Sequence, residues 1–165
     1  MDFANLKIQY QKYQIDIDNR IKMVLNDSKY IMGPEINELE SALESFTDSR
    51  YAISCSSGTD ALTLSLMTMD IKPGDEIITT PFSFISTAET IALMKAVPVF
   101  VDIEPDTFNI DAGKIEAAIT KKTRIIMPVS LFGQPAQMNT IQAIADNYNL
   151  KVIIDGAQSF GSTYK

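Results

Sequence analysis

The sequence of 165 residues contains no histidine, no tryptophan and a single cysteine, Cys55. Without histidine, this chain holds no Ser-His-Asp triad, no Cys-His catalytic pair and no histidine-ligated metal ion. With one cysteine, it holds no intramolecular disulfide and no cysteine-rich zinc site. These absences exclude several common classes of hydrolase and zinc protein, and we expect no metal site.

Positive charge is also scarce, since 14 Lys and Arg residues stand against 21 Asp and Glu residues and give a net charge of -7. Nucleic acid partners require a basic patch, so we expect none. No apolar run approaches the roughly 18 residues that a membrane span needs. The first residues lack the basic and apolar regions of a signal peptide. We therefore expect a cytoplasmic protein without a membrane partner.

From residue 51 onward, short apolar runs alternate with helical patterns. Strands are expected at residues 51–55, 76–80, 97–101, 123–129 and 151–155, and helices at 61–69, 86–95, 111–119 and 138–148. Strands that alternate with helices through short connections predict an α/β fold, with a mostly parallel sheet and helices on both faces.

Before residue 51 the pattern is helical only. Residues 9–27 carry apolar side chains at roughly helical spacing, and Pro34 opens a second helix with one apolar face. We therefore divide the chain into an N-terminal helical segment, residues 1–50, and an α/β domain, residues 51–165.

The last apolar run ends on a carboxylate. Residues 152–155 are predicted to form a short buried strand that ends at Asp155, and Gln158 follows three residues later. Parallel sheets bind ligands outside the carboxyl ends of their strands, where Asp155 is expected to lie. The alternative is that Asp155 only caps the next turn, because Asp is a common turn residue.

A second strand end offers an anion site. Residues 56–59, with the sequence Ser-Ser-Gly-Thr, lie between an expected strand and an expected helix. Unpaired backbone N–H groups and the helix dipole favour a phosphate there, although an ordinary N-cap uses the same residue types. A P-loop after Gly156 is disfavoured, because Ser162 stands where that motif requires Lys.

Two aromatic residues, Phe82 and Phe84, follow the strand expected at residues 76–80. They either pack in the core or stack on a flat ligand ring. Together, the three strand ends offer a phosphate site, an aromatic ring and a carboxylate. Pyridoxal phosphate fits this set, because a carboxylate at its ring nitrogen keeps the ring protonated as the electron sink for carbanion chemistry.

Several motifs, in the same order along the chain, resemble the DegT/DnrJ/EryC1/StrS family of nucleotide-sugar aminotransferases. The motifs are Gly33-Pro34-Glu35, Ser57-Gly58-Thr59-Asp60-Ala61-Leu62, Pro73-Gly74-Asp75-Glu76-Ile77-Ile78, Phe84 and Asp155-Gly156-Ala157-Gln158-Ser159-Phe160-Gly161. The resemblance covers nearly the whole chain. It implies the large domain of the aspartate-aminotransferase type of fold (fold type I), with pyridoxal 5'-phosphate as cofactor.

The resemblance implies a role for each matching residue. The implied cofactor-binding residues are Ser57, Gly58, Thr59, Phe84, Asp155 and Gln158. The first three would hold the cofactor phosphate, and Phe84 would stack on the ring. Asp155 would bind the ring nitrogen, and Gln158 would contact the phenolic oxygen.

The implied reaction transfers an amino group from glutamate to a keto group of a nucleotide-linked sugar. The motif at residues 155–161 is most similar to that of enzymes acting on UDP-linked 3-keto-glucuronic acid derivatives for surface polysaccharide. Phe160 stands where many members have His, so the sugars used by other relatives remain alternative substrates.

The resemblance also implies a catalytic residue that has no match here. The family's Schiff-base Lys lies well beyond the Asp-x-x-Gln motif, whereas this sequence ends at Lys165, ten residues after Asp155. We therefore expect a truncated chain that is inactive alone, with an incomplete sheet and no small C-terminal domain. Family members are usually homodimers with the active site at the interface, and we expect the same of the full-length enzyme.

Two other interpretations stay open. Sugar dehydratases of the same family replace that Lys with His, so a residue outside this sequence distinguishes the two reactions. A non-catalytic α/β module that retains only a phosphate pocket belongs to a different class, and it would fold independently of the cofactor.

Overall fold

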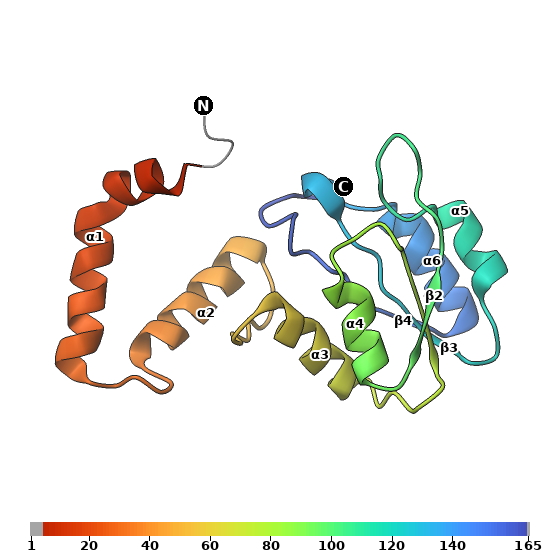
Figure 1. Ribbon diagram of the computed structural model, residues 1–165, viewed down its shortest axis with the longest axis horizontal. Helices are drawn as coiled ribbons and strands as arrows, with labels where there is room; N and C mark the ends of the chain where they lie inside the picture. The colour runs from red at the N-terminus through yellow and green to blue at the C-terminus, as the bar shows by residue number, and fades with distance from the viewer. Residues whose placement is uncertain (1–4, 165) are drawn as a thin grey trace. The chain divides into compact units, whose positions relative to one another are not determined.

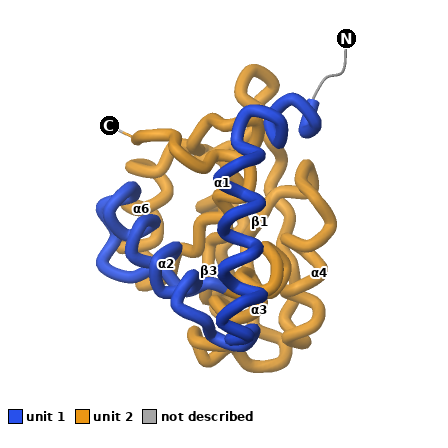
Figure 2. Tube along the Cα trace, turned by 90° about the vertical axis from the view of Figure 1, so that its left-hand side faces the viewer, with its two compact units in different colours: residues 1–54 blue, residues 55–165 orange. Residues whose placement is uncertain are grey.

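The computed structural model describes residues 5–164 (Figure 1). The chain forms two compact units, Met1–Ser54 and Cys55–Lys165, which Figure 2 shows in blue and orange. None of the helices within residues 5–164 combines the length and the apolarity required to cross a membrane.

The first unit consists of two helices, α1 (Leu6–Asp27) and α2 (Pro34–Thr47). Helix α2 begins at Pro34, as the sequence predicts. Helix α1 begins before the predicted residue 9, because Asn5 caps it by accepting a hydrogen bond from the Ile8 N–H at 3.0 Å. Neither helix buries a side chain within this described unit, and the apolar face expected on α2 is half-buried at most.

The strand predicted at residues 51–55 is wrong. These residues form no ladder, and their backbone bonds to helix α2 instead. The Ala52 N–H donates to Glu44 Oε1 at 3.1 Å, and the Ser54 N–H donates to Glu40 Oε1 at 2.8 Å. These bonds tie the segment to α2 and not to a strand of the sheet. The backbone bond from Ser54, followed by the bond from its hydroxyl, lowers the pKa of Glu40.

The second unit contains a four-stranded sheet in the order β2-β1-β3-β4, with every pair parallel. The strands are β1 (Glu76–Thr79), β2 (Val97–Phe100), β3 (Thr123–Ile126) and β4 (Lys151–Val152). This parallel sheet confirms the predicted fold class. The strands are shorter than expected, and β4 most of all. An isolated parallel bridge joins Val129 and Asp155 beyond its end.

Helices cover both faces of the sheet (Figure 1). Helices α3 (Gly58–Thr68) and α4 (Ser86–Leu93) pack on one face, against Ile77 and Ile125. Helices α5 (Ala112–Ile115) and α6 (Met138–Tyr148) pack on the other, against Ile78 and Ile126. Successive strand residues therefore fill two separate cores, as the two-residue period of a strand requires.

Two short helices complete the unit, η1 (Glu116–Ala118) and η2 (Leu131–Gly133). The helix predicted at residues 111–119 is accordingly α5 followed by a turn of 3-10 helix. The run at 152–155 is also less buried than predicted, because the Ile154 side chain is 52% exposed.

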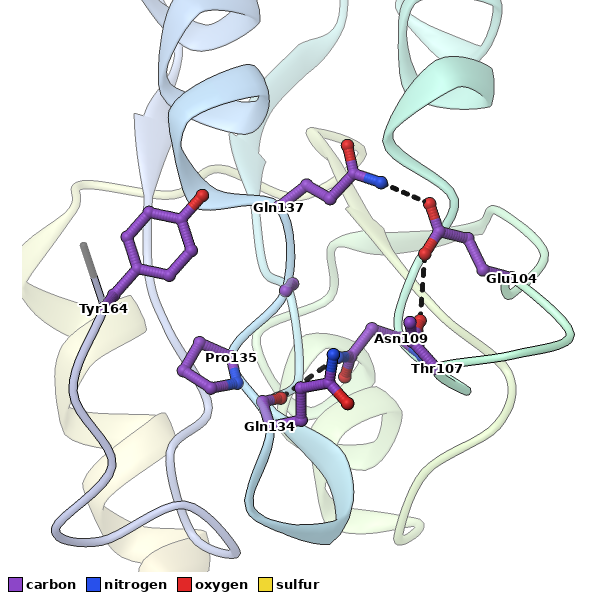
Figure 3. Close-up of a pocket in the computed structure, with 8 residues that line it drawn as sticks. Glu104, Thr107, Asn109, Gln134, Pro135, Gln137 and Tyr164 are labelled. Carbon is purple, nitrogen blue, oxygen red and sulfur yellow. Dashed lines mark hydrogen bonds between the residues drawn. The ribbon is translucent and has the colours of Figure 1, made fainter.

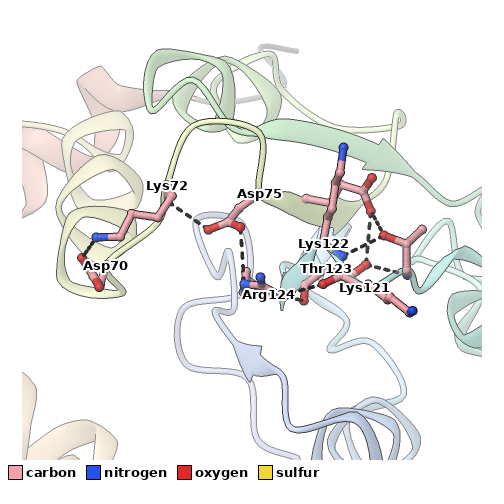
Figure 4. A network of polar contacts seen from close by, with 9 residues as sticks. Asp70, Lys72, Asp75, Lys121, Lys122, Thr123 and Arg124 are labelled. Carbon is pink, nitrogen blue, oxygen red and sulfur yellow. Dashed lines mark hydrogen bonds and ion pairs between the residues drawn. The ribbon is translucent and has the colours of Figure 1, made fainter.

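The amino edge of the sheet is occupied by the chain's own charges (Figure 4). The Arg124 guanidinium lies 3.3 Å from the Asp75 carboxylate, and the Thr120 hydroxyl donates to Glu76 Oε2 at 2.5 Å. Lys72 pairs with Asp70. These contacts tie the starts of β1 and β3 together, so the polar groups at this edge are largely engaged with one another.

The two cores generate a stability prediction. Ile78→Ala removes a fully buried side chain and should lower the free energy of unfolding by roughly 2–5 kcal/mol. Ile154→Ala, at a half-exposed position, should lower the free energy of unfolding by less than about 1 kcal/mol. Urea denaturation of both variants checks this difference, and equal losses would show that the side of the sheet on which Ile78 lies is not a packed core.

Candidate functional site

A hollow of about 190 Å³ opens at the carboxyl edge of the sheet. Four of the predicted site residues line it: Gly58, Thr59, Phe84 and Asp155. They come from the start of α3, the loop after β1 and the end of the β4 chain segment. The structure thus brings together the three segments that the sequence singles out, although the segment at Gly58 and Thr59 does not follow a strand.

Asp155 is the buried charge of this hollow, with 8% of the residue exposed. Its Oδ2 accepts a hydrogen bond from the Thr87 hydroxyl at 2.9 Å, and its Oδ1 accepts one from the Ala157 N–H at 3.2 Å. The bond to Ala157 is the turn-capping contact considered as the alternative. Among the described residues, no Lys or Arg pairs with this carboxylate. A buried carboxylate without a cation suits a ligand that carries positive charge.

The start of α3 forms the second wall. A side-chain carbon built on Gly58 would meet nothing within 4 Å, so the space above it is open. The backbone N–H groups of Gly58 and Thr59 have no hydrogen-bond partner within the described residues. Two open donors at a helix N-terminus fit an anion such as a phosphate.

Ser57 acts as the N-cap of α3. Its Oγ accepts from the Asp60 N–H at 3.1 Å and donates to Asp60 Oδ2 at 3.0 Å, and Ser56 donates to the same oxygen. Ser57 does not line the hollow. Its hydroxyl therefore caps α3, which is the alternative that the sequence offers for this residue.

Phe84 is 70% exposed and lines the hollow, as a ring that stacks on a ligand requires. Core packing of the two aromatics, the alternative from the sequence, is wrong, because Phe82 is also 44% exposed. The Phe82 ring stacks instead on Phe108, with centroids 5.7 Å apart, and Phe132 meets both rings edge-on.

Gln158 does not line the hollow. Its Oε1 accepts a hydrogen bond from the Phe132 N–H at 3.2 Å, which leaves Nε2 as the donor end of the amide. Phe132 has a φ of 54°, a left-handed conformation that costs a residue with a side chain roughly 1–2 kcal/mol. Gln158 therefore supports a strained loop beside the site.

Sequence reasoning missed Ser86 and Thr87, which also line the hollow. Both belong to the segment after β1, where only the aromatic residues were singled out. The available signal was two successive hydroxyl residues at the start of an apolar helix. Their partners are distant in sequence, because the bond from Thr87 to Asp155 spans 68 residues.

A larger hollow of about 260 Å³ lies between the loops that follow β2 and β3 (Figure 3). Among the described residues that line it, Glu104 is the one with a charged side chain, and it accepts from Gln137 Nε2 at 2.6 Å and from the Thr107 hydroxyl at 2.9 Å. None of the residues that the sequence predicts for the site lines this hollow. The smaller hollow at Asp155 is therefore the better candidate for a phosphorylated cofactor.

Known proteins resemble this chain throughout its length. Residues 11–165 match the DegT/DnrJ/EryC1/StrS aminotransferase family. The chain is 49% identical over 165 residues to the UDP-2-acetamido-2-deoxy-3-oxo-D-glucuronate aminotransferase of Pseudomonas aeruginosa, of which it covers 46%.

Two solved structures are similar in fold. DesV of S. venezuelae superposes with a TM-score of 0.95 at 34% identity, over 97% of this chain and 43% of that one. The GDP-4-keto-6-deoxy-D-mannose-3-dehydratase of E. coli, with bound hydrated PLP, gives a TM-score of 0.83 at 29% identity, over 88% and 39%. The chain thus spans less than half the length of these relatives.

The start of α3 generates a pH prediction. Hydrogen bonds from the Ser56 and Ser57 hydroxyls hold the pKa of Asp60 below its ordinary value of 3.8. A lowered folded-state pKa means that the ionised carboxylate stabilises the fold above the unfolded pKa. This stabilisation is lost as the pH falls through the folded pKa.

Asp60→Asn should therefore be less stable than wild type at neutral pH, and the difference should shrink as the pH falls below 3.8. Unfolding curves recorded across this range measure it. Asp106→Asn, at an exposed carboxylate, is the matched control and should show little difference at any pH. A pH-independent difference for Asp60→Asn would contradict the role assigned to its charge.

Proposed function

Because the chain belongs to the DegT/DnrJ/EryC1/StrS aminotransferase family, we propose that the protein is a pyridoxal-phosphate-dependent aminotransferase. Its substrate is a nucleotide-linked keto sugar. The observation that carries the proposal is the buried, cation-free carboxylate of Asp155, which shares one hollow with the open N-terminus of α3. Since the chain spans less than half of its relatives, the activity is proposed for the whole protein.

The residues in and beside the hollow match the parts of the cofactor. The N–H groups of Gly58 and Thr59 would bind the phosphate, with Ser57 capping the helix. Phe84 would stack on the ring and Asp155 would bind the ring nitrogen. Gln158, beside the hollow, would offer its Nε2 donor to the phenolic oxygen.

Asp155 has the most demanding of these roles. Its carboxylate would accept the N–H of the ring nitrogen and so hold a proton there. The cofactor, when bound, would supply an electron sink for a carbanion, which depends on that proton. Water is poorly placed to compete, since only 8% of Asp155 is exposed.

For the substrate we propose a UDP-linked 3-oxo sugar acid, with glutamate as the amino donor. Support comes from the 49% identity to the aminotransferase of Pseudomonas aeruginosa, whose name specifies UDP-2-acetamido-2-deoxy-3-oxo-D-glucuronate. The product would enter surface polysaccharide synthesis in the cytoplasm. We expect the whole protein to be a homodimer.

A second candidate is a sugar dehydratase that uses the same cofactor. It is favoured by the similarity to the E. coli GDP-4-keto-6-deoxy-D-mannose-3-dehydratase, at a TM-score of 0.83. Both reactions need the same phosphate site, stacking ring and carboxylate, so the hollow serves either one.

Asp155→Asn tests the cofactor site. Loss of the charge should weaken binding of pyridoxal phosphate by roughly ten- to a hundredfold, because a hydrogen bond to a charged group is worth about 1.5–3 kcal/mol. Absorbance titration measures this binding. The control is Asp102→Asn, at an exposed carboxylate in the loop after β2, which should bind like wild type. Equal affinities for Asp155→Asn and wild type would refute the proposed site.

Isotope labelling separates the two reactions. With ¹⁵N-glutamate and a UDP-linked 3-oxo sugar acid, an aminotransferase places the label on the sugar. A dehydratase releases the label as ammonia and yields a deoxy sugar. We expect labelled amino sugar in the mass spectrum of the products, and labelled ammonia with a deoxy sugar would favour the second candidate.

A further inference from the structure

We propose that Ser86 and Thr87, adjacent residues at the start of α4, are positioning residues that set the two ends of the cofactor hollow. Thr87 orients Asp155 and Ser86 orients Thr59. The inference rests on the proposed function, and it adds two residues that neither the family motifs nor the sequence pattern assigns.

Thr87 fixes the carboxylate of Asp155. The residue is 1% exposed, and its hydroxyl donates to Asp155 Oδ2 at 2.9 Å. A threonine hydroxyl has one proton. The contact of 3.0 Å between the Ser83 and Thr87 hydroxyls is therefore donated by Ser83. The result is a directed chain from Ser83 through Thr87 to the carboxylate.

The directed chain restricts how Asp155 can turn. Oδ2 is held by Thr87 and Oδ1 by the Ala157 N–H at 3.2 Å, so rotation of the carboxylate breaks at least one bond. The remaining lone pairs then point in a fixed direction. Orientation of this kind lets a carboxylate meet the N–H of a bound ring without first reorganising.

Ser86 orients the Thr59 side chain at the end of the hollow where the phosphate would bind. It is 6% exposed, and its Oγ lies 2.8 Å from Thr59 Oγ1. If Ser86 donates, the Thr59 hydroxyl keeps its own proton for a phosphate oxygen. Thr59 also supplies one of the two open N–H groups of α3, so its side chain and backbone face the same anion.

The two contacts are coupled because they start from neighbouring residues of one helix. The first turn of α4 is closed by backbone bonds from Thr87 to Phe84 at 3.2 Å and from Glu89 to Ile85 at 2.8 Å. This rigid turn fixes the separation between the phosphate end and the nitrogen end. Phe84 directly precedes this turn. The start of α4 therefore positions Thr59, Asp155 and Phe84 around the hollow.

An ordinary packing role for these hydroxyls makes a different prediction. If they only satisfied buried polar groups, removing either one would weaken every ligand of the hollow equally. If they position the two ends, each removal should affect one end of the ligand. Three probes separate the cases: pyridoxamine phosphate, pyridoxamine without phosphate, and a phosphorylated analogue with CH in place of the ring nitrogen.

Thr87→Val keeps the shape of the side chain and removes its hydroxyl. This variant should weaken the binding of pyridoxamine phosphate roughly tenfold and should bind the CH analogue with wild-type affinity. Thr87→Ser restores the hydroxyl and should restore the affinity. Ser86→Ala should weaken the binding of pyridoxamine phosphate by a factor of roughly five and should leave the binding of pyridoxamine unchanged. Calorimetric titration gives all of these dissociation constants.

Thr90→Val is the matched control, because Thr90 is a fully buried threonine on the same helix. Its hydroxyl donates to the Thr87 carbonyl at 3.4 Å and, within the described residues, makes no hydrogen bond to Asp155 or Thr59. It should bind all three probes like wild type. Equal weakening of pyridoxamine phosphate and its CH analogue by Thr87→Val, or failure of Thr87→Ser to recover binding, would overturn the inference.

Binding to the wild-type protein tests the proposed cofactor separately from the role of Thr87. If the wild-type protein binds none of the probes, the cofactor assignment is wrong. Crystal structures of the ligand-free Thr87→Val and Thr87→Ser variants then test the positioning role alone. We expect the Asp155 carboxylate to turn away in the valine variant and to keep its orientation in the serine variant. An unchanged carboxylate in both would contradict the role of Thr87.

Discussion

The backbone bridge between Val129 and Asp155 is the interaction on which the candidate site depends. The Asp155 N–H donates to the Pro128 carbonyl at 3.0 Å, and the Ser130 N–H donates to the Asp155 carbonyl at 3.0 Å. This bridge continues the pairing of β3 and β4 beyond the ends of the strands. It holds a charged residue at the carboxyl edge of a parallel sheet, where crossover connections leave room for a ligand.

The surroundings of that residue explain how a buried charge is tolerated. Two hydrogen bonds, from Thr87 and from the Ala157 N–H, replace part of the water that the carboxylate loses. Helix α4 provides one of these bonds and also contacts the start of α3 through Ser86. The anion site and the carboxylate are therefore parts of one hydrogen-bonded arrangement, although they lie far apart in the sequence.

Much of this arrangement could be predicted from the sequence, because it depends on local signals. The parallel sheet and the position of Asp155 at its carboxyl edge follow from periodicity and turn chemistry. Helix α3 is also expected, but it begins at Gly58 and not at residue 61. Four of the six predicted site residues line one hollow. Gln158 lies beside it, bonded to the Phe132 backbone, and Ser57 caps the helix below it.

The predictions that were wrong or missing concern residues whose contacts are made with residues distant in the sequence. Residues 51–55 have a strand-like pattern, but their N–H groups bind glutamates of α2, which no periodicity reveals. Thr87 is an ordinary helical threonine until the fold brings Asp155 next to it. The exposure of Phe82 likewise depends on Phe108 and Phe132, which arrive from the loops after β2 and β3.

A crystal structure of the protein with pyridoxamine phosphate tests the central claim most directly. The account predicts a phosphate on the N–H groups of Gly58 and Thr59, with the ring nitrogen against the Asp155 carboxylate and the ring against Phe84. A ligand bound in the hollow at Glu104, or one whose ring nitrogen faces away from Asp155, would contradict it.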